Sequence, residues 1–178
     1  MKTFINPIIL STVLCLLFIP NLQAQQAIRE GTFTISKSTY KISKLNTYKE
    51  YVIGNVDKSE LKPDPEVVNG FPSEFIRTKM TNSKELDKVA CEALGKDKRE
   101  QLTAAQEKIS GWIYYRADGT VINMVFAVKE NTVLTLDDLA RIERVLQKRF
   151  TATFESEPSN FHLHLNRITK NYEWDFSK

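Results

Sequence analysis

The sequence predicts an α+β fold, in which an antiparallel sheet has two helical segments packed on one face. Two runs rich in β-branched and aromatic residues flank Asp118-Gly119 within residues 111–128, which is typical of a β-hairpin. Residues 82–109 and 135–150 repeat apolar side chains at helical spacing. The chain has 178 residues, of which 42% are hydrophobic and 26% charged. These proportions are typical of one globular domain and argue against disorder, collagen and a coiled coil.

The N-terminus has the layout of a secretory signal peptide. Lys2 precedes an apolar run over residues 8–19, and Ala24 follows it, which is the order of basic region, apolar core and small cleavage-site residue. The apolar run is shorter than the ~20 residues that a membrane-spanning helix needs. We therefore expect residues 1–24 to be removed. Residues 25–178 would remain as a single α+β domain without a membrane span, periplasmic or secreted.

Two other fates of the N-terminus stay open. The apolar segment could remain in place as an uncleaved anchor. Cys15 could carry a lipid anchor. A lipobox, however, has a small residue directly before its cysteine, whereas this chain has Leu14 there, and the apolar run continues past Cys15. We therefore interpret Cys15 as part of the apolar core of the signal peptide.

The net charge and the cysteine content limit the classes of partner and the disulfide bonds that we expect for this chain. Removal of Lys2 with the signal peptide lowers the net charge from +3 to +2. A small and mixed charge argues against nucleic acid as a partner. Cys91 is then the remaining cysteine, and a lone cysteine cannot form an internal disulfide. Three interpretations stay open: a bystander buried under the N-terminal strands, a residue that links a dimer in an oxidising compartment, or a catalytic nucleophile.

Residues 25–58 are predicted to form the N-terminal strands. Phe33 and Ile35 alternate with polar residues, and so do Tyr40 and Ile42, which is the period of a half-buried strand.

Residues 59–81 are predicted to form a proline-containing loop. Pro63, Pro65 and Pro72 lie close together in this segment, and prolines at this density do not fit a helix interior or a central strand. The segment could instead separate an N-terminal β-unit from the rest of the chain. A loop is favoured, because strands over some thirty residues would make a thin domain.

Residues 82–109 are predicted to be helical. Asn82 is a favourable N-cap residue, and Glu85 stands three positions later, where a capping box requires it. Gly95 can end a first helix, so the segment is two helices or one long helix with a break. The predicted apolar stripe consists of Leu86, Val89, Ala90, Ala93 and Leu94, continued by Leu102, Ala105 and Ile109.

Residues 111–128 are predicted to form a hairpin around Asp118-Gly119. A two-residue type I′ turn at this dipeptide pairs Tyr115 with Ile122 and Ile113 with Met124. One face then carries Ile113, Tyr115, Ile122, Met124 and Phe126, and we expect helices to cover it. The other face carries Trp112, Tyr114, Arg116, Val121, Asn123 and Val125.

Residues 135–150 are predicted to be a second helical segment. Thr135 is its N-cap, with Asp138 at the third helical position, and Leu134 and Leu139 occupy the positions of a hydrophobic staple. The buried stripe comprises Leu136, Leu139, Ile142, Leu146 and Phe150.

Residues 161–176 are predicted to form a closing hairpin, because apolar residues alternate with polar ones in both of its halves. Residues 82–178 would thus run helix, hairpin, helix, hairpin.

His162 and His164 are candidate metal ligands. A His-X-His pair on a strand places both imidazoles on one face, and imidazole is a common zinc ligand. A carboxylate would have to supply a further ligand, because these are the two histidines of the chain. The alternative interpretation is the polar face of a strand, and no metal or other cofactor is expected.

Two groups of residues are candidates for partner binding. Trp112 and Tyr114 lie on the hairpin face that the predicted helices do not claim, where aromatic side chains could bind a partner or a glycan. Arg141, Arg144 and Lys148 form a basic stripe on the second helix. The stripe could bind a partner, or it could complement the helix dipole together with the acidic first turn. Burial of Trp112 and Tyr114 under other strands is the alternative for the aromatic pair.

The chain offers no recognisable catalytic motif. It has no serine nucleophile elbow, no glycine-rich phosphate loop and no His-Glu-X-X-His sequence. We therefore expect an exported, non-catalytic binding module of the bacterial cell envelope, with an envelope protein, peptide or glycan as its partner. The alternative is a small metal-dependent hydrolase that uses His162 and His164.

The order of elements over about residues 110–168 resembles the C-terminal domain of TonB proteins. The resemblance is carried by a strand, Asp118-Gly119, a strand beginning at Val121 and a helix beginning Leu136-Asp137. It implies a periplasmic α+β module that docks strands or peptides of envelope partners. The chain departs from TonB proteins in its cleavable signal and its additional N-terminal half. The signal peptide and the many short strands also resemble small exported proteins of unknown function from Bacteroidetes-type bacteria.

Overall fold

The computed structural model describes residues 27–58, 76–157 and 159–176. The predicted signal peptide and the prolines of the predicted loop lie outside these ranges. Within them, no helix is both long enough and apolar enough to span a membrane.

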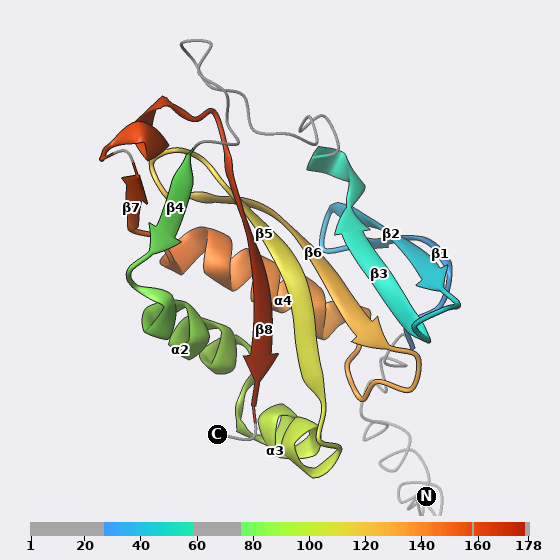
Figure 1. Ribbon diagram of the computed structural model, residues 1–178. Helices are drawn as coiled ribbons and strands as arrows, with labels where there is room; N and C mark the ends of the chain where they lie inside the picture. The colour runs from blue at the N-terminus through green and yellow to red at the C-terminus, as the bar shows by residue number, and fades with distance from the viewer. Residues whose placement is uncertain (1–26, 59–75, 158, 177–178) are drawn as a thin grey trace, which may run out of the picture.

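The N-terminal segment forms three strands, as predicted. They are β1 (Gly31–Ile35), β2 (Ser38–Leu45) and β3 (Glu50–Asn55), joined as an antiparallel meander (Figure 1). A short 3-10 turn, η1 (Val56–Lys58), follows β3.

The N-terminal meander continues directly into the rest of the sheet. β3 pairs with β6 (Val121–Lys129), which pairs with β5 (Lys108–Tyr115), and β5 pairs with β8 (Ile168–Asp175). All of these pairs are antiparallel, and the strand order is β1-β2-β3-β6-β5-β8. Because β3 lies beside β6, the N-terminal strands extend the main sheet and share its core.

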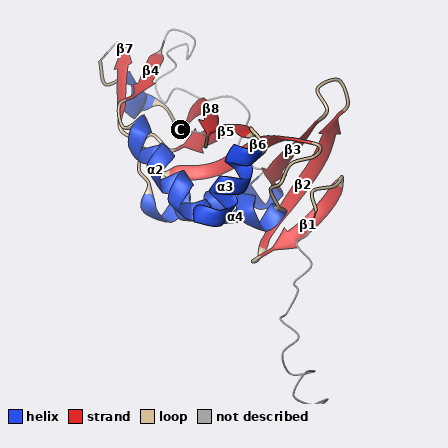
Figure 2. Ribbon diagram, turned by 90° about the horizontal axis from the view of Figure 1, so that it is seen from below, coloured by secondary structure: helices blue, strands red, loops and turns tan. Residues whose placement is uncertain are grey.

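The helices lie on one face of this sheet (Figure 2). They are α2 (Ser83–Leu94), α3 (Lys96–Ala104) and α4 (Leu136–Arg149). The core between the layers is apolar, and its largest fully buried side chains include Tyr40, Tyr115, Phe126, Ile53, Leu86, Leu139 and Ile142. This arrangement confirms the predicted α+β class, an antiparallel sheet with helical segments on one face.

The helix α4 agrees with its prediction. The Thr135 hydroxyl accepts a hydrogen bond from the Asp138 N–H at 3.2 Å, and Asp138 Oδ2 accepts one from the Thr135 N–H at 3.0 Å. This reciprocal pair completes the capping box. Every residue of the predicted stripe is buried, namely Leu136, Leu139, Ile142, Leu146 and Phe150.

The first helical segment forms two helices separated by Gly95, which is the first of the two predicted alternatives. The segment ends at Ala104, however, and Lys108 begins β5. The prediction of helix as far as residue 109 was therefore wrong. Ile109 lies on β5 opposite Trp174 and is fully buried. Its apolar side chain is therefore removed from water in the strand, as it would have been in the predicted helix.

The predicted capping box of α2 was also wrong. Asn82 occupies the N-cap position, but its side chain makes no cap hydrogen bond. The Asn82 amide instead donates to the Thr151 carbonyl at 3.0 Å, and its oxygen accepts from the Thr153 N–H at 2.9 Å. Asn82 therefore fastens the start of α2 to the segment that follows α4.

The hairpin of β5 and β6 has the predicted strands and a different turn. Ile113 pairs with Met124 as predicted, but Tyr115 pairs with Val121, and the register shifts between Tyr114 and Tyr115. The Arg116 N–H donates to the Thr120 carbonyl at 2.9 Å, which closes a three-residue loop. Gly119 has φ 85°. This loop type carries its glycine at the position of positive φ.

The extra turn residue changes which side chains are buried. Val121 is 4% exposed and takes the core position that the predicted register gave to Ile122. Val121 therefore belongs to the buried face, while Trp112, Tyr114, Asn123 and Val125 share the other face as predicted. The prediction of a type I′ turn was thus wrong. The error shifts the strand register by one residue next to the turn and leaves the pairing of Ile113 with Met124 as predicted.

A second, two-stranded sheet was not predicted. It pairs β4 (Arg77–Met80) with β7 (Phe154–Glu157), so the final residues of the predicted loop are a strand. The predicted closing hairpin is half correct. β8 is present, but Phe161–His164 form the 3-10 helix η3 and not a strand.

Candidate binding site

The face of the main sheet opposite the helices carries Trp112 and Tyr114. No helix of the described residues lies on this face (Figures 1 and 2). Trp112 stands opposite Val125 on β6 and Asn171 on β8, and 37% of it is exposed. Tyr114, two positions further along β5, is half-buried. The structure thus brings the two predicted aromatic candidates together on one sheet face that no described helix covers.

Arg167 lies against Tyr114 and was not predicted as a site residue. Its guanidinium carbon lies 5.3 Å from the centre of the Tyr114 ring, a cation–π geometry. Arg167 is 4% exposed, and among the described residues its Nε and Nη2 atoms have no hydrogen-bond partner. It immediately precedes β8, within the predicted closing hairpin, where no spacing or neighbouring motif distinguished it.

A pocket of about 370 Å³ opens between the start of β8 and the start of β4. Three cationic residues, Arg77, Arg167 and Lys170, are among its lining residues, as are Thr78 and Thr169. The Lys170 ammonium donates to the Thr78 carbonyl, which joins the two strands. Burial lowers the pKa of Lys170. The remaining lining residues, Ile76, Leu165 and Ile168, are apolar.

A second pocket of about 530 Å³ lies beside β4 and β7 and contains His162. The Ser156 hydroxyl and His162 Nδ1 are 3.0 Å apart, and the backbone N–H of His162 donates to the same hydroxyl at 3.2 Å. The ring of His164 instead packs edge-on against Phe161, with centroids 5.8 Å apart. The strand that would have placed both imidazoles on one face is a 3-10 turn.

The described residues place no group of metal ligands around these histidines. Within residues 27–58, 76–157 and 159–176, no three His, Cys, Asp or Glu side chains come together in a way that could hold a metal ion. A zinc site needs at least three protein ligands. The geometry therefore offers no support for metal binding at His162 and His164.

The basic stripe of α4 lies on the other side of the molecule. Arg141, Arg144 and Lys148 are exposed, on the side of α4 turned away from Leu139 and Ile142, which face the sheet. The Arg144 Nε–H donates to the Ala140 carbonyl at 3.2 Å. Because the helical layer and the sheet separate them from Trp112, the two groups of predicted candidates do not form one surface.

Cys91 is half-buried on α2 and packs against the hydrophobic core. It has no disulfide partner among the described residues. Burial raises the pKa of its thiol, as does the nearby Asp87, while Arg99 acts in the opposite direction. The thiol form is therefore favoured, and the thiolate needed for reaction is disfavoured.

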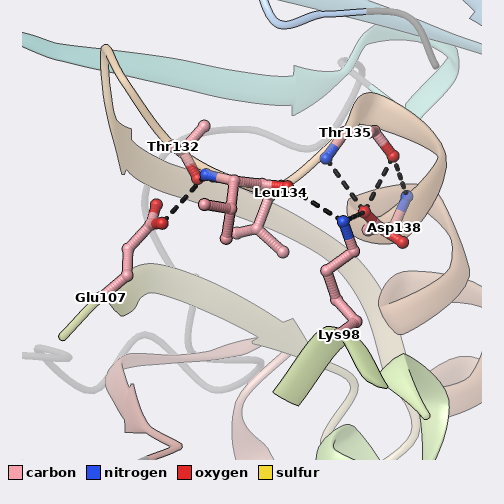
Figure 3. Close-up of polar contacts among 7 residues, drawn as sticks. Lys98, Glu107, Thr132, Leu134, Thr135 and Asp138 are labelled. Atoms are coloured by element: carbon pink, nitrogen blue, oxygen red, sulfur yellow. Dashed lines mark hydrogen bonds and ion pairs between the residues drawn. The ribbon is translucent and has the colours of Figure 1, made fainter. Parts of the chain in front are cut away.

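Figure 3 shows a further polar cluster, at the N-terminus of α4. Lys98 Nζ lies 3.3 Å from Asp138 Oδ2 and donates to the Val133 carbonyl at 3.0 Å. Glu107 Oε2 accepts from the Val133 N–H at 3.0 Å. The side chains of Lys98 and Asp138 are 12% and 7% exposed. The ion pair between Lys98 and Asp138 joins α3 to α4. Because both side chains are nearly closed to solvent, we interpret the cluster as structural and not as a binding surface.

The fold defines the class of this protein as an α+β protein with one helical layer and one sheet face that no described helix covers. No protein-family model matches the chain, and no curated protein sequence matches it. Among solved structures, it is similar to the crystal structure of a DUF5043 family protein from Bacteroides uniformis. That likeness covers 84% of this chain and 86% of the other, with a TM-score of 0.61 and 15% sequence identity.

At this identity the likeness shows a shared fold. It is consistent with the expected resemblance to proteins of Bacteroidetes-type bacteria. The comparisons do not show the expected resemblance to TonB proteins, which stays a prediction for residues 110–168.

Proposed function

We propose that this chain is an exported, non-catalytic binding module of the bacterial cell envelope, and that its ligand is a glycan bound over Trp112. The observation that carries the proposal is the partly exposed indole ring of Trp112 on the sheet face that no described helix covers. A buried indole would need no partner, whereas an exposed one offers a flat apolar surface with a polar edge.

The surroundings of Trp112 favour a small polar ligand over a protein partner. Asn171 and Glu173 on β8 are exposed on the same face, and Ser110 on β5 is half-buried beside them. Protein interfaces are typically centred on a contiguous apolar core, which this polar setting does not provide. A sugar ring fits better, because it can stack on the indole while its hydroxyls bond to the neighbouring side chains.

A glycan array followed by fluorescence titration tests the proposal. The chain has two tryptophans, and Trp174 is 3% exposed, so a ligand at this site changes mainly the emission of Trp112. We expect Trp112→Ala to weaken binding at least about tenfold. Tyr48→Ala is the matched control, because Tyr48 is an aromatic residue with 71% exposure in the turn between β2 and β3. Absence of any glycan ligand, or equal loss in both variants, would contradict the proposal.

The metal-dependent hydrolase remains the alternative proposal and has no support from the geometry of the described residues. It predicts stoichiometric zinc in the purified protein, lost in His164→Ala. Metal analysis of both proteins therefore decides between the two functions independently of the glycan array.

A further inference from the structure

We propose that the pocket between β4 and β8 binds an oxyanion, a sulfate, phosphate or carboxylate group, held by the guanidinium of Arg167. The proposal rests on Arg167 and the other residues that line this pocket. It is independent of glycan binding at Trp112.

The state of Arg167 is the first reason. Its guanidinium is permanently charged and almost fully buried, yet Nε and Nη2 have no acceptor among the described residues. Buried charged groups in native proteins are nearly always paired or hydrogen-bonded, because an unpaired one loses its hydration without compensation. Two unsatisfied N–H groups on one guanidinium therefore indicate a missing acceptor. The fork of adjacent N–H groups matches the paired oxygens of an oxyanion.

The other lining residues have the same preference. The described lining residues include two further cationic residues, Arg77 and Lys170, and no carboxylate. Thr169 contributes a hydroxyl whose oxygen is buried without a hydrogen-bond partner among the described residues. An anion would accept hydrogen bonds from the guanidinium and from this hydroxyl. It would also compensate for the burial that lowers the pKa of Lys170.

Two contacts hold residues of the pocket lining in place. The Tyr114 ring lies 5.3 Å from the guanidinium carbon and supports one face of the Arg167 side chain. The hydrogen bond from Lys170 to the Thr78 carbonyl joins β8 to β4. A volume of about 370 Å³ can hold a small anion or the acidic group of a larger molecule.

Calorimetric titration of the whole protein with sodium sulfate, sodium phosphate and sodium acetate tests the proposal, with sodium chloride at matched ionic strength as the blank. We expect saturable binding of at least one oxyanion and none of chloride. A further arm with glucuronate distinguishes a free anion from the acidic group of a saccharide, because tighter binding of glucuronate than of acetate assigns the site to the larger molecule.

Arg167→Met removes the proposed binding group and keeps an unbranched apolar side chain. We expect it to weaken oxyanion binding at least about tenfold, since charge-assisted hydrogen bonds are the strong ones. In chloride its melting temperature should be equal to or above that of the wild type, because an unpaired buried charge is lost. Lys41→Met, which removes an exposed cation on β2, should bind as the wild type does.

Two further variants keep the test decisive if Arg167→Met does not fold. Arg167→Lys retains the charge but loses the fork, and Thr169→Val removes the unpartnered hydroxyl. Each should weaken binding severalfold. The proposal is overturned if the wild type shows no saturable oxyanion binding. It is equally overturned if the folded Arg167 and Thr169 variants bind oxyanions as tightly as the wild type.

Discussion

The hydroxyl of Tyr40 donates a 2.7 Å hydrogen bond to Glu143 Oε2, and both side chains are buried. Tyr40 lies on β2 in the N-terminal meander, and Glu143 lies on α4. The same carboxylate accepts from the Asn55 amide at 3.3 Å and from the Gln147 amide at 3.0 Å. This network joins the N-terminal strands to the helical layer by polar contacts as well as by packing.

Removal of the Tyr40 hydroxyl should therefore destabilise the fold. Tyr40→Phe leaves a buried carboxylate with one hydrogen bond fewer, and we expect a loss of about 1–3 kcal/mol in the free energy of unfolding. Tyr115→Phe is the matched control, because the Tyr115 hydroxyl is buried without a hydrogen-bond partner among the described residues. That control should be neutral or stabilising. Urea denaturation measures both, and an equal loss in the two variants would show that the hydrogen bond to Glu143 is unimportant.

Gly119 should tolerate no side chain. Its φ is 85°, and a Cβ atom would lie 1.9 Å from the Ala152 carbonyl oxygen. The Ala152 N–H also donates to the Gly119 carbonyl at 2.9 Å, so the two backbones cannot separate without losing a hydrogen bond. We expect Gly119→Ala to cost about 2–4 kcal/mol in thermal or urea unfolding.

Gly54→Ala is the control for this prediction. A Cβ at Gly54 would lie 3.5 Å from Val125 Cγ2, which is an ordinary van der Waals contact. Its effect should stay within about 0.5 kcal/mol. A mild effect at Gly119 would mean that the turn can move away from Ala152.

The ion pair between Lys98 and Asp138 should contribute more than an exposed pair on the same helix. Lys98→Met leaves Asp138 buried with its hydrogen bonds from Thr135, and we expect a loss of about 1–3 kcal/mol. Lys96 and Glu100 form an i, i+4 pair whose side chains are 79% and 65% exposed. Lys96→Met should leave the urea midpoint unchanged. Equal midpoints for the two variants would contradict the structural role of the buried pair.

The protein should lose stability at alkaline pH. Burial, with a smaller contribution from Asp87, raises the pKa of Tyr172 to about 12. Burial likewise raises the pKa values of Tyr40 and Tyr115. A pKa raised in the folded state means that the unfolded tyrosines ionise first. This contribution to stability is thus complete below about pH 10 and is lost as the pH rises toward 12.

Urea midpoints at pH 8, 10 and 11, together with absorbance at 295 nm, measure this effect. The midpoint should hold between pH 8 and the onset of ionisation and then fall. Complete ionisation of all tyrosines near pH 10 in a protein that stays folded would contradict the burial described above.

Cys91 should react slowly with thiol reagents. The half-burial that raises its pKa also restricts access, so modification by Ellman's reagent at pH 8 should be much slower than in urea. The disulfide-linked dimer through Cys91 stays a prediction. A dimer band on a non-reducing gel, absent in Cys91→Ser, would establish it and would show that the cysteine becomes accessible.

The sequence signals that succeeded are local ones. The capping box and the apolar stripe of α4 lie within the helix that they define, so Thr135, Asp138 and Leu139 are enough to place it. The hairpin strands were predicted because their apolar side chains are periodic. The position of the turn was predicted as well, but its type was not, and Gly119 packs against Ala152, which lies in a segment beyond α4.

The features that could not be predicted depend on contacts between residues that are far apart in the sequence. β4 is four residues long, and the Thr81 N–H beyond it bonds to the Thr153 carbonyl at 2.9 Å. The sequence predicted a capping side chain at Asn82. It could not show that this side chain bonds instead to the backbone of Thr151 and Thr153, about seventy residues later in the chain. Arg167 carried no signal, because its importance comes from its burial beside Tyr114 and not from its neighbours in sequence.

The pairing of β3 with β6 has a consequence for how this chain folds. Both the N-terminal meander and the β5–β6 hairpin join strands that are close in sequence, so each can form early. Ile53 and Phe126, which face each other across β3 and β6, are far apart along the chain. Joining them closes a long loop, which costs entropy before the contacts are made. Formation of this junction should therefore limit the folding rate, and until it forms β3 and β6 are open edges that can pair with another copy of the chain.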